Sequence, residues 1–140
     1  MPTKDITTSV RRALAAIGVF ILTATPPAFA HHAFAAEFDA NKKVTFEGEL
    51  TKVAWFNPHG WIYIDVVDAG TTTNWSIEFG SPTSLLRKGL RRTDFQPGTR
   101  LTVKGYRARS GKPVANASNV TLPDGRSLFA GSANSPDGER

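Results

Sequence analysis

Apolar and polar residues alternate in three segments of the chain between residues 44 and 79. The apolar or glycine positions are Val44, Phe46, Gly48 and Leu50 in the first segment, Ile62, Ile64 and Val66 in the second, and Trp75, Ile77 and Phe79 in the third. A period of two places successive side chains on opposite faces of a β-strand. The pattern therefore predicts three strands, each with one buried face.

One short helix is expected after the third strand. Ser81 is a good N-cap, and Pro82 suits the first helical position because its missing N–H costs no hydrogen bond there. Gly89 can end the helix in a left-handed conformation. The local signals for the start and the end of this helix agree.

Two more strands are expected after the helix, at residues 99–109 and at about 114–122. Gly105 interrupts the first of them and indicates a bulge. Three strands, one helix and two strands is the order of an OB-like five-stranded barrel, a small closed Greek key. We therefore predict an all-β fold with one short helix, and an open five-stranded sheet packed on the helix is the alternative.

The first thirty residues have the three zones of a secretory signal peptide. Basic residues precede an uncharged apolar run at 13–24, and Ala28-Phe29-Ala30 offers small residues for cleavage. The apolar run is too short to span a bilayer. We therefore expect a periplasmic or secreted protein without a membrane span. Arg11-Arg12 leaves open whether export follows the general or the twin-arginine route.

Cleavage after Ala30 suggests a division of the chain into four parts. These are the signal peptide at 1–30, a leader at 31–43, an OB-like β domain at 44–130 and a disordered tail at 131–140. The chain contains no cysteine, and a single domain of this size needs no disulfide. Removal of the signal peptide lowers the formal net charge from +5 to +3. This mild surplus in an exported chain does not indicate nucleic-acid binding.

Four short stretches of the mature chain resemble one family. They are HHAFAAEFD at 31–39, WFNPH at 55–59, FGSP at 79–82 and VTLPDG at 120–125. They resemble a family of small exported bacterial proteins of unknown function whose mature chains begin His-His-(Ser/Ala)-Phe. The resemblance spans about residues 31–131 and implies export and a single β domain, but no reaction. Ala33 stands where many such chains have serine, so no role for that hydroxyl carries over.

The candidate chemistry lies in three histidines: His31, His32 and His59. After cleavage at Ala30, the α-amine and imidazole of His31 can chelate a metal in one ring. A further imidazole then completes a three-nitrogen histidine brace, which favours Cu(II). His59, in the loop between the first two strands, is the expected third donor, and His32 is a further ligand or a supporting residue. The alternative is that all three are ordinary exposed or turn residues.

The residues that are absent narrow the type of metal site. The only methionine is Met1, which is lost with the signal peptide, and the chain has no cysteine. Without sulfur ligands, blue-copper and Cu(I) thiolate sites are excluded. A nitrogen and oxygen site remains, suited to Cu(II) and less specifically to Zn or Ni. This hypothesis requires Phe34 and Phe38 to dock the leader near His59.

A second candidate site is aromatic. Trp61 and Tyr63 are expected on the outward face of the second strand, with Trp55 beside them across the hairpin. Such a face can stack on a small ligand or on an exported protein partner. The alternative is that the leader covers these rings and makes them a small satellite core.

An enzymatic function is not favoured by the sequence. Glu47, Glu49, Asp65 and Glu78 have no spacing that marks an acid–base pair, and no Gly-rich phosphate loop is present. We therefore expect an exported binding or accessory protein whose partner is a divalent metal, possessing no catalytic residues. A metal-independent module that recognises a small ligand or a protein partner through the aromatic face is the alternative.

Overall fold

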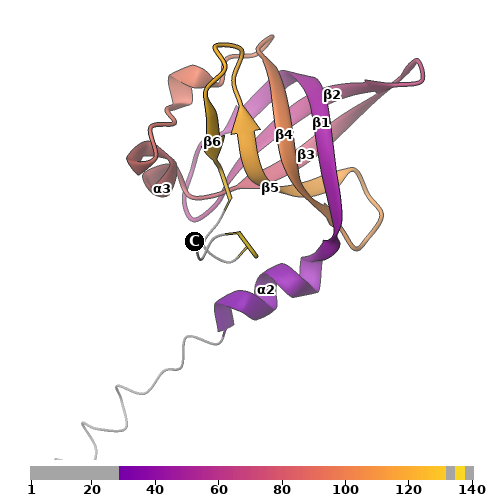
Figure 1. Ribbon diagram of the computed structural model, residues 1–140, viewed down its shortest axis with the longest axis vertical. Coiled ribbons are helices and arrows are strands. Elements are labelled where there is room, and N and C mark those ends of the chain that lie inside the picture. The colour runs from indigo at the N-terminus through magenta and orange to yellow at the C-terminus, as the bar shows by residue number, and fades with distance from the viewer. Residues whose placement is uncertain (1–28, 132–134, 138–140) are drawn as a thin grey trace, which may run out of the picture.

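The computed structural model describes residues 29–131 and 135–137 (Figure 1). The N-terminal elements are helix α2 (Phe29–Glu37) and strands β1 (Phe38–Ala54), β2 (Gly60–Asp68) and β3 (Thr71–Phe79). Helix α3 (Pro82–Arg87), the 3-10 helix η1 (Arg92–Asp94) and strands β4 (Arg100–Ala108), β5 (Val114–Thr121) and β6 (Ser127–Phe129) follow. Most of the predicted signal peptide, residues 1–28, lies outside the described residues.

Five strands pair in a ring. The sheet order is β3-β2-β1-β4-β5, with antiparallel neighbours, and β3 also pairs with β5 in parallel. The prediction of an OB-like arrangement is confirmed, and the open-sheet alternative is wrong because β3 pairs with β5. Only three residue pairs join β3 to β5, so the ring is closed over a short length and is not a regular barrel. β6 adds a sixth strand beside β5.

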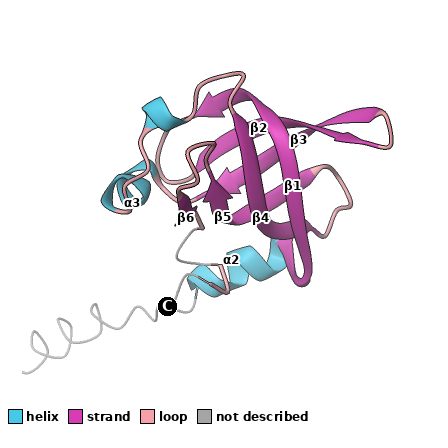
Figure 2. Ribbon diagram, turned by 45° about the horizontal axis from the view of Figure 1, so that its top comes forward, coloured by secondary structure: helices cyan, strands magenta, loops and turns pink. Residues whose placement is uncertain are grey.

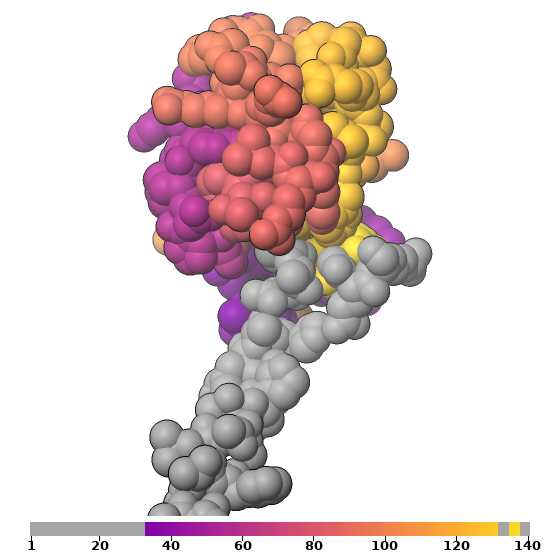
Figure 3. All heavy atoms as spheres, turned by 90° about the vertical axis from the view of Figure 1, so that its left-hand side faces the viewer, coloured from indigo at the N-terminus to yellow at the C-terminus, as the bar shows by residue number. Residues whose placement is uncertain are grey.

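The ring encloses the main hydrophobic core. Most inward residues of the predicted alternation are buried, Ile62, Ile64 and Ile77 fully so, whereas Val44, Phe46 and Val66 are partly buried against the core. Phe79 stacks on Phe95, with ring centroids 5.8 Å apart. Figure 3 shows the segment around α3 lying between the N-terminal strands and the yellow C-terminal segment. The segment after β3 therefore completes the core on this side of the molecule.

Helix α3 begins and ends as its sequence predicts. The Ser81 side chain accepts a hydrogen bond from the Ser84 backbone N–H, and Pro82 occupies the first turn. Gly89 has φ +88°, the left-handed conformation expected after the helix. The pairing of β4 with β5 is irregular at Gly105, but the extra residue is on β5: Lys104 pairs with Asn119 and Gly105 with Ala117, which leaves Ser118 unpaired with β4.

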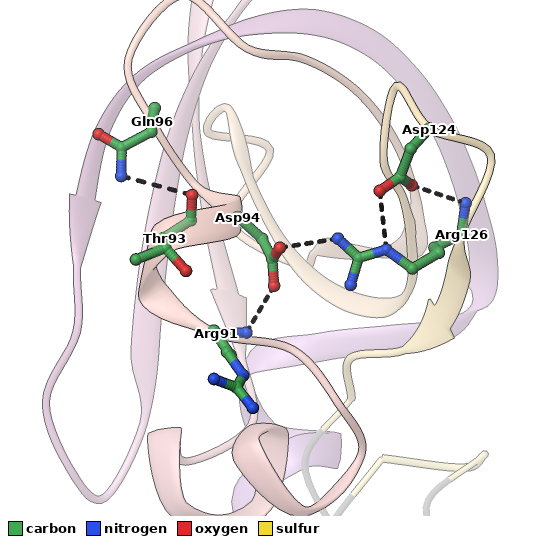
Figure 4. A network of polar contacts seen from close by, with 6 residues as sticks. All are labelled: Arg91, Thr93, Asp94, Gln96, Asp124 and Arg126. Carbon is green, nitrogen blue, oxygen red and sulfur yellow. Dashed lines mark hydrogen bonds and ion pairs between the residues drawn. The ribbon is translucent and has the colours of Figure 1, made fainter.

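A polar network joins η1 to the turn before β6 (Figure 4). Arg126 donates to Asp94 at 2.7 Å and to Asp124 at 2.8 Å, and Asp94 also accepts from the Arg91 backbone N–H. Partial burial raises the pKa of Asp94, but the hydrogen bonds from Arg126 and Arg91 outweigh it, so the pKa lies below its ordinary value. The network fixes two exposed loops to each other.

The N-terminal segment differs from the expected leader at 31–43. Its first residues belong to helix α2, and β1 begins at Phe38 rather than near Val44. The expected turn at 39–41 lies inside β1 as an irregularity, because pairing with β4 is interrupted between Phe38 and Lys43. The Asn41 backbone N–H donates to the Asp39 side chain there, so the local turn signal produces a bulge.

The C-terminal residues also differ from the expected disordered tail at 131–140, where the structure describes them. Ser135 is buried, and the Tyr106 hydroxyl donates to the Asp137 carboxylate at 2.6 Å. The last described residues therefore pack against the outer side of β4. Among the described residues, no helix combines the length and apolar character needed to cross a bilayer.

Candidate functional site

Four side chains lie in one row across the outer face of the ring. Trp61 on β2 pairs with Glu78 on β3, Glu78 pairs with Asn116 on β5, and Asn116 pairs with Tyr106 on β4. The residues flanking Asn116 along β5 are alanines that belong to the main core. Because side chains alternate along a strand, this row faces away from the core.

Helix α2 covers part of this outer face (Figure 2). Phe34 and Phe38 are buried with Tyr106 and Ala108 in a second apolar cluster, separate from the main core. The Phe34 ring lies 5.5 Å from both the Phe38 and the Tyr106 ring centroids. This packing confirms that Phe34 and Phe38 dock the N-terminal segment on the barrel.

Polar contacts from the β4–β5 hairpin also hold α2. Arg109 donates from Nε to the Ala35 carbonyl at 2.8 Å and from its backbone N–H to the Glu37 carbonyl at 2.9 Å. These contacts satisfy carbonyls near the C-terminal end of the helix, which have no partner within it. The position of α2 is therefore fixed by apolar and polar contacts together.

A cavity of about 220 Å³ lies where α2 meets the row of outer residues. Phe34, Phe38 and Trp61 supply its apolar wall. Its polar lining consists of Glu37, His59, Glu78 and Asn116, and Ala33 completes the side formed by α2. The cavity therefore brings the predicted donor His59 next to the helix that follows the expected cleavage site.

His59 contacts Glu78 through ring nitrogen Nδ1 and carboxylate oxygen Oε1. Glu78 is 5% exposed, whereas the His59 side chain is 38% exposed. When Glu78 is ionised, its carboxylate can only accept a hydrogen bond, so in that state Nδ1 of His59 carries the proton that it donates. The Nε2 lone pair then remains free for a ligand, which is the arrangement of many metal-binding histidines.

The pKa of Glu78 is raised because burial disfavours its charged form, and hydrogen bonding and charge attraction from His59 oppose this only in part. The folded chain therefore keeps this proton at pH values where the unfolded chain has lost it. Stability is lost as the pH rises from the ordinary carboxyl pKa through the raised one.

We expect the substitution Glu78→Gln to remove this loss of stability. Urea unfolding at a series of pH values should show that the free energy of unfolding of the wild type falls relative to the variant as the pH rises through that window. Glu49→Gln changes an exposed carboxylate on β1 and should leave the wild-type profile as it is. Parallel profiles for the wild type and Glu78→Gln would contradict the prediction.

The structure describes the backbone of the other two predicted metal ligands but not their side chains. Both residues, His31 and His32, lie in α2. Among the described residues, no group of three His, Cys, Asp or Glu side chains is arranged to hold a metal ion.

The predicted aromatic face is wrong for Trp55. Trp61 and Tyr63 are half-buried on the outer face, but Trp55 packs against Phe79 and Phe95 of the core, with centroids 5.7 Å apart in both cases. The reason is the register of the β1–β2 hairpin, in which Ala54 pairs with Trp61. Trp55, the next residue, therefore points inward.

Sequence reasoning did not place Glu78, Asn116 and Glu37 in one cavity. Glu78 looked like an ordinary outward carboxylate, although its position between the buried Ile77 and Phe79 near a strand end was a usable signal. Asn116 stands in a run of small residues and gives no local signal. Its proximity to Glu78 follows from the β3–β5 pairing alone.

Comparison with known protein families shows a match over residues 19–117 to a profile described as "Family of unknown function (DUF6152)". No curated protein and no solved structure matches the chain. The matched range includes α2, His59 and Asn116, and therefore all the residues that line the cavity.

Proposed function

The chain belongs to the DUF6152 family of unknown function, and we propose from its site that it is an exported binding or accessory protein for Cu(II) or a similar divalent ion. In this proposal, cleavage after Ala30 exposes His31 as the new N-terminus. The α-amine and imidazole of His31 bind the ion together with Nε2 of His59. His32 is a further ligand or supports the other two.

The contact between His59 and Glu78 is the observation that carries the proposal. A carboxylate on one ring nitrogen fixes the orientation of the imidazole and raises the basicity of the other nitrogen. His59 is also exposed enough to be reached from solvent.

The position of α2 supports His31 as the partner of His59. Positions three apart share a face of a helix, and His31 is three residues before Phe34, which lines the cavity. The positions three and four residues after His32 are Ala35 and Ala36, which do not line it. We therefore assign the larger role to His31.

The donor set also bears on the choice of ion. Three nitrogen donors without sulfur favour Cu(II) over the other common divalent ions. The amine and imidazoles must lose their protons to bind, so affinity is expected to fall as the pH drops below about 7.

Isothermal titration with Cu(II) tests the proposal. We expect the chain that begins at His31 to bind one ion, and His59→Ala or acetylation of the α-amine to weaken binding by at least about tenfold. Glu78→Gln should weaken it by about tenfold or more, as expected for a residue that orients a ligand. Glu49→Gln serves as the matched control.

Cu(II) binding that is unchanged by His31→Ala would overturn the proposal. If the correctly processed chain bound no ion, the alternative of a metal-independent binding module would remain. Its aromatic surface would then consist of Trp61 and Tyr63, since Trp55 packs into the core.

A further inference from the structure

The cavity beneath α2 contains a buried polar atom without a partner. Asn116 is 1% exposed, and its side-chain oxygen Oδ1 forms no hydrogen bond with any described residue. Buried polar atoms in folded proteins are nearly always hydrogen-bonded, and each exception calls for an explanation. Because Asn116 lines the cavity, a bound molecule can supply the missing partner.

The neighbouring carboxyl group fixes which end of the Asn116 amide is free. Glu78 and Asn116 are paired across β3 and β5, and their side chains are hydrogen-bonded. Only the amide nitrogen can donate to a carboxylate, so the nitrogen is used there. The free atom is the acceptor Oδ1, which requires a ligand with an N–H or O–H donor.

The charge of the lining favours a cationic donor. Two carboxylates, Glu37 and Glu78, line the cavity, and none of its described lining residues is a lysine or an arginine. Phe34, Phe38 and Trp61 present aromatic rings, which attract cations through their negative faces. The volume of about 220 Å³ equals roughly seven times the volume that one water molecule occupies in the liquid.

We propose that this cavity binds a small primary ammonium ion, whose N–H donates to Asn116 Oδ1 while its charge faces the carboxylates of Glu37 and Glu78. The aromatic wall accommodates the short alkyl group of the ion. This binding requires neither a metal nor a free amine at His31, so it can be tested on the metal-free chain, although both proposed sites share Glu78.

Nuclear magnetic resonance of the ¹⁵N-labelled processed chain, kept metal-free with EDTA, tests the proposal. The probe is ethylammonium chloride, compared with tetramethylammonium chloride and with ethanol at matched ionic strength. We expect ethylammonium to shift the Asn116 side-chain amide and the Trp61 indole signals with a dissociation constant on the order of millimolar, since so small a ligand has limited binding free energy. Tetramethylammonium has the charge without an N–H, and ethanol has a donor without the charge, so both should bind at least tenfold more weakly.

A variant provides the second test. Asn116→Leu keeps a similar volume and removes the acceptor, so ethylammonium binding should weaken at least tenfold, whereas Asn41→Leu, on the exposed bulge of β1, should not affect it. Equal binding of ethylammonium and tetramethylammonium, or full binding by a folded Asn116→Leu variant, would overturn the proposal. If Asn116→Leu does not fold, the comparison of the three probes in the wild type decides.

A chain whose N-terminal amine is acetylated separates this inference from the copper proposal. The blocked amine should weaken copper binding by at least about tenfold and leave ethylammonium binding intact. Loss of copper binding therefore leaves the ammonium site standing, and failure of ethylammonium to bind leaves the copper site standing.

Discussion

Replacing Gly105 with alanine should destabilise the barrel by about 3 kcal/mol or more, at the upper end of the range for an overpacked site. A Cβ at this position would lie 2.1 Å from the backbone oxygen of Asn116 on the neighbouring strand. Backbone atoms cannot rotate away from such a contact, so β4 and β5 must move apart where they pair. Thermal unfolding should show a midpoint lower by roughly 12–24 °C for a domain of this size.

Gly125→Ala is the matched control for this prediction. Gly125 has φ +85° in an exposed turn, and an added Cβ there meets no atom within 4 Å. Its cost is the backbone strain of a left-handed alanine, about 1–2 kcal/mol. If the two variants had the same unfolding midpoint, the close approach of β4 and β5 at Gly105 would not be a determinant of stability.

The substitution Phe34→Ala is expected to release α2 from the barrel without unfolding the rest of the chain. Phe34 is buried against Phe38 and Tyr106, and loss of its ring removes roughly 2–3 kcal/mol of apolar burial. Because α2 lies outside the main core, this cost should appear as local opening. Amide hydrogen exchange in α2 should accelerate by about thirtyfold or more, at roughly tenfold per 1.4 kcal/mol.

Phe56→Ala provides the comparison, since Phe56 is 57% exposed in the loop between β1 and β2. It should change neither the exchange of α2 nor the affinity for Cu(II). Phe34→Ala should weaken both the copper and the ethylammonium binding, because each proposed site includes residues of α2. Unchanged exchange in α2 after Phe34→Ala would show that the contacts of Arg109 alone hold the helix.

The elements that sequence analysis predicted are those that depend on local signals. The alternation in the first three strands reports one buried face, and the N-cap Ser81 with Gly89 defines α3 without any distant contact. The docking of Phe34 and Phe38 was a requirement of the metal hypothesis and is present, but helix α2, which carries Phe34, was not predicted, and Phe38 begins β1. The order of the predicted strands and α3 was sufficient to indicate an OB-like ring.

The features that could not be predicted from the sequence depend on contacts between distant parts of the chain. The register shift in the pairing of β1 with β2 between Leu50 and Lys52 determines that Ala54, and not Trp55, shares the outer face with Trp61. The meeting of Glu78 with Asn116 requires two strands that are far apart in the sequence to pair. His59 could be predicted as a ligand from its residue type, but the carboxylate that orients it could not.

β3 and β5 pair over only three residues, so the separation of these strands depends on whether a molecule is bound in the cavity beside them. Glu78 and Asn116 form the last of the three residue pairs between β3 and β5. A molecule that touches both side chains is bound only while these strands are joined, so it adds RT ln(1 + [L]/Kd) to the free energy needed to part them. A molecule bound in the cavity would therefore hold the ring closed, and slower amide exchange in β3 and β5 would report its presence.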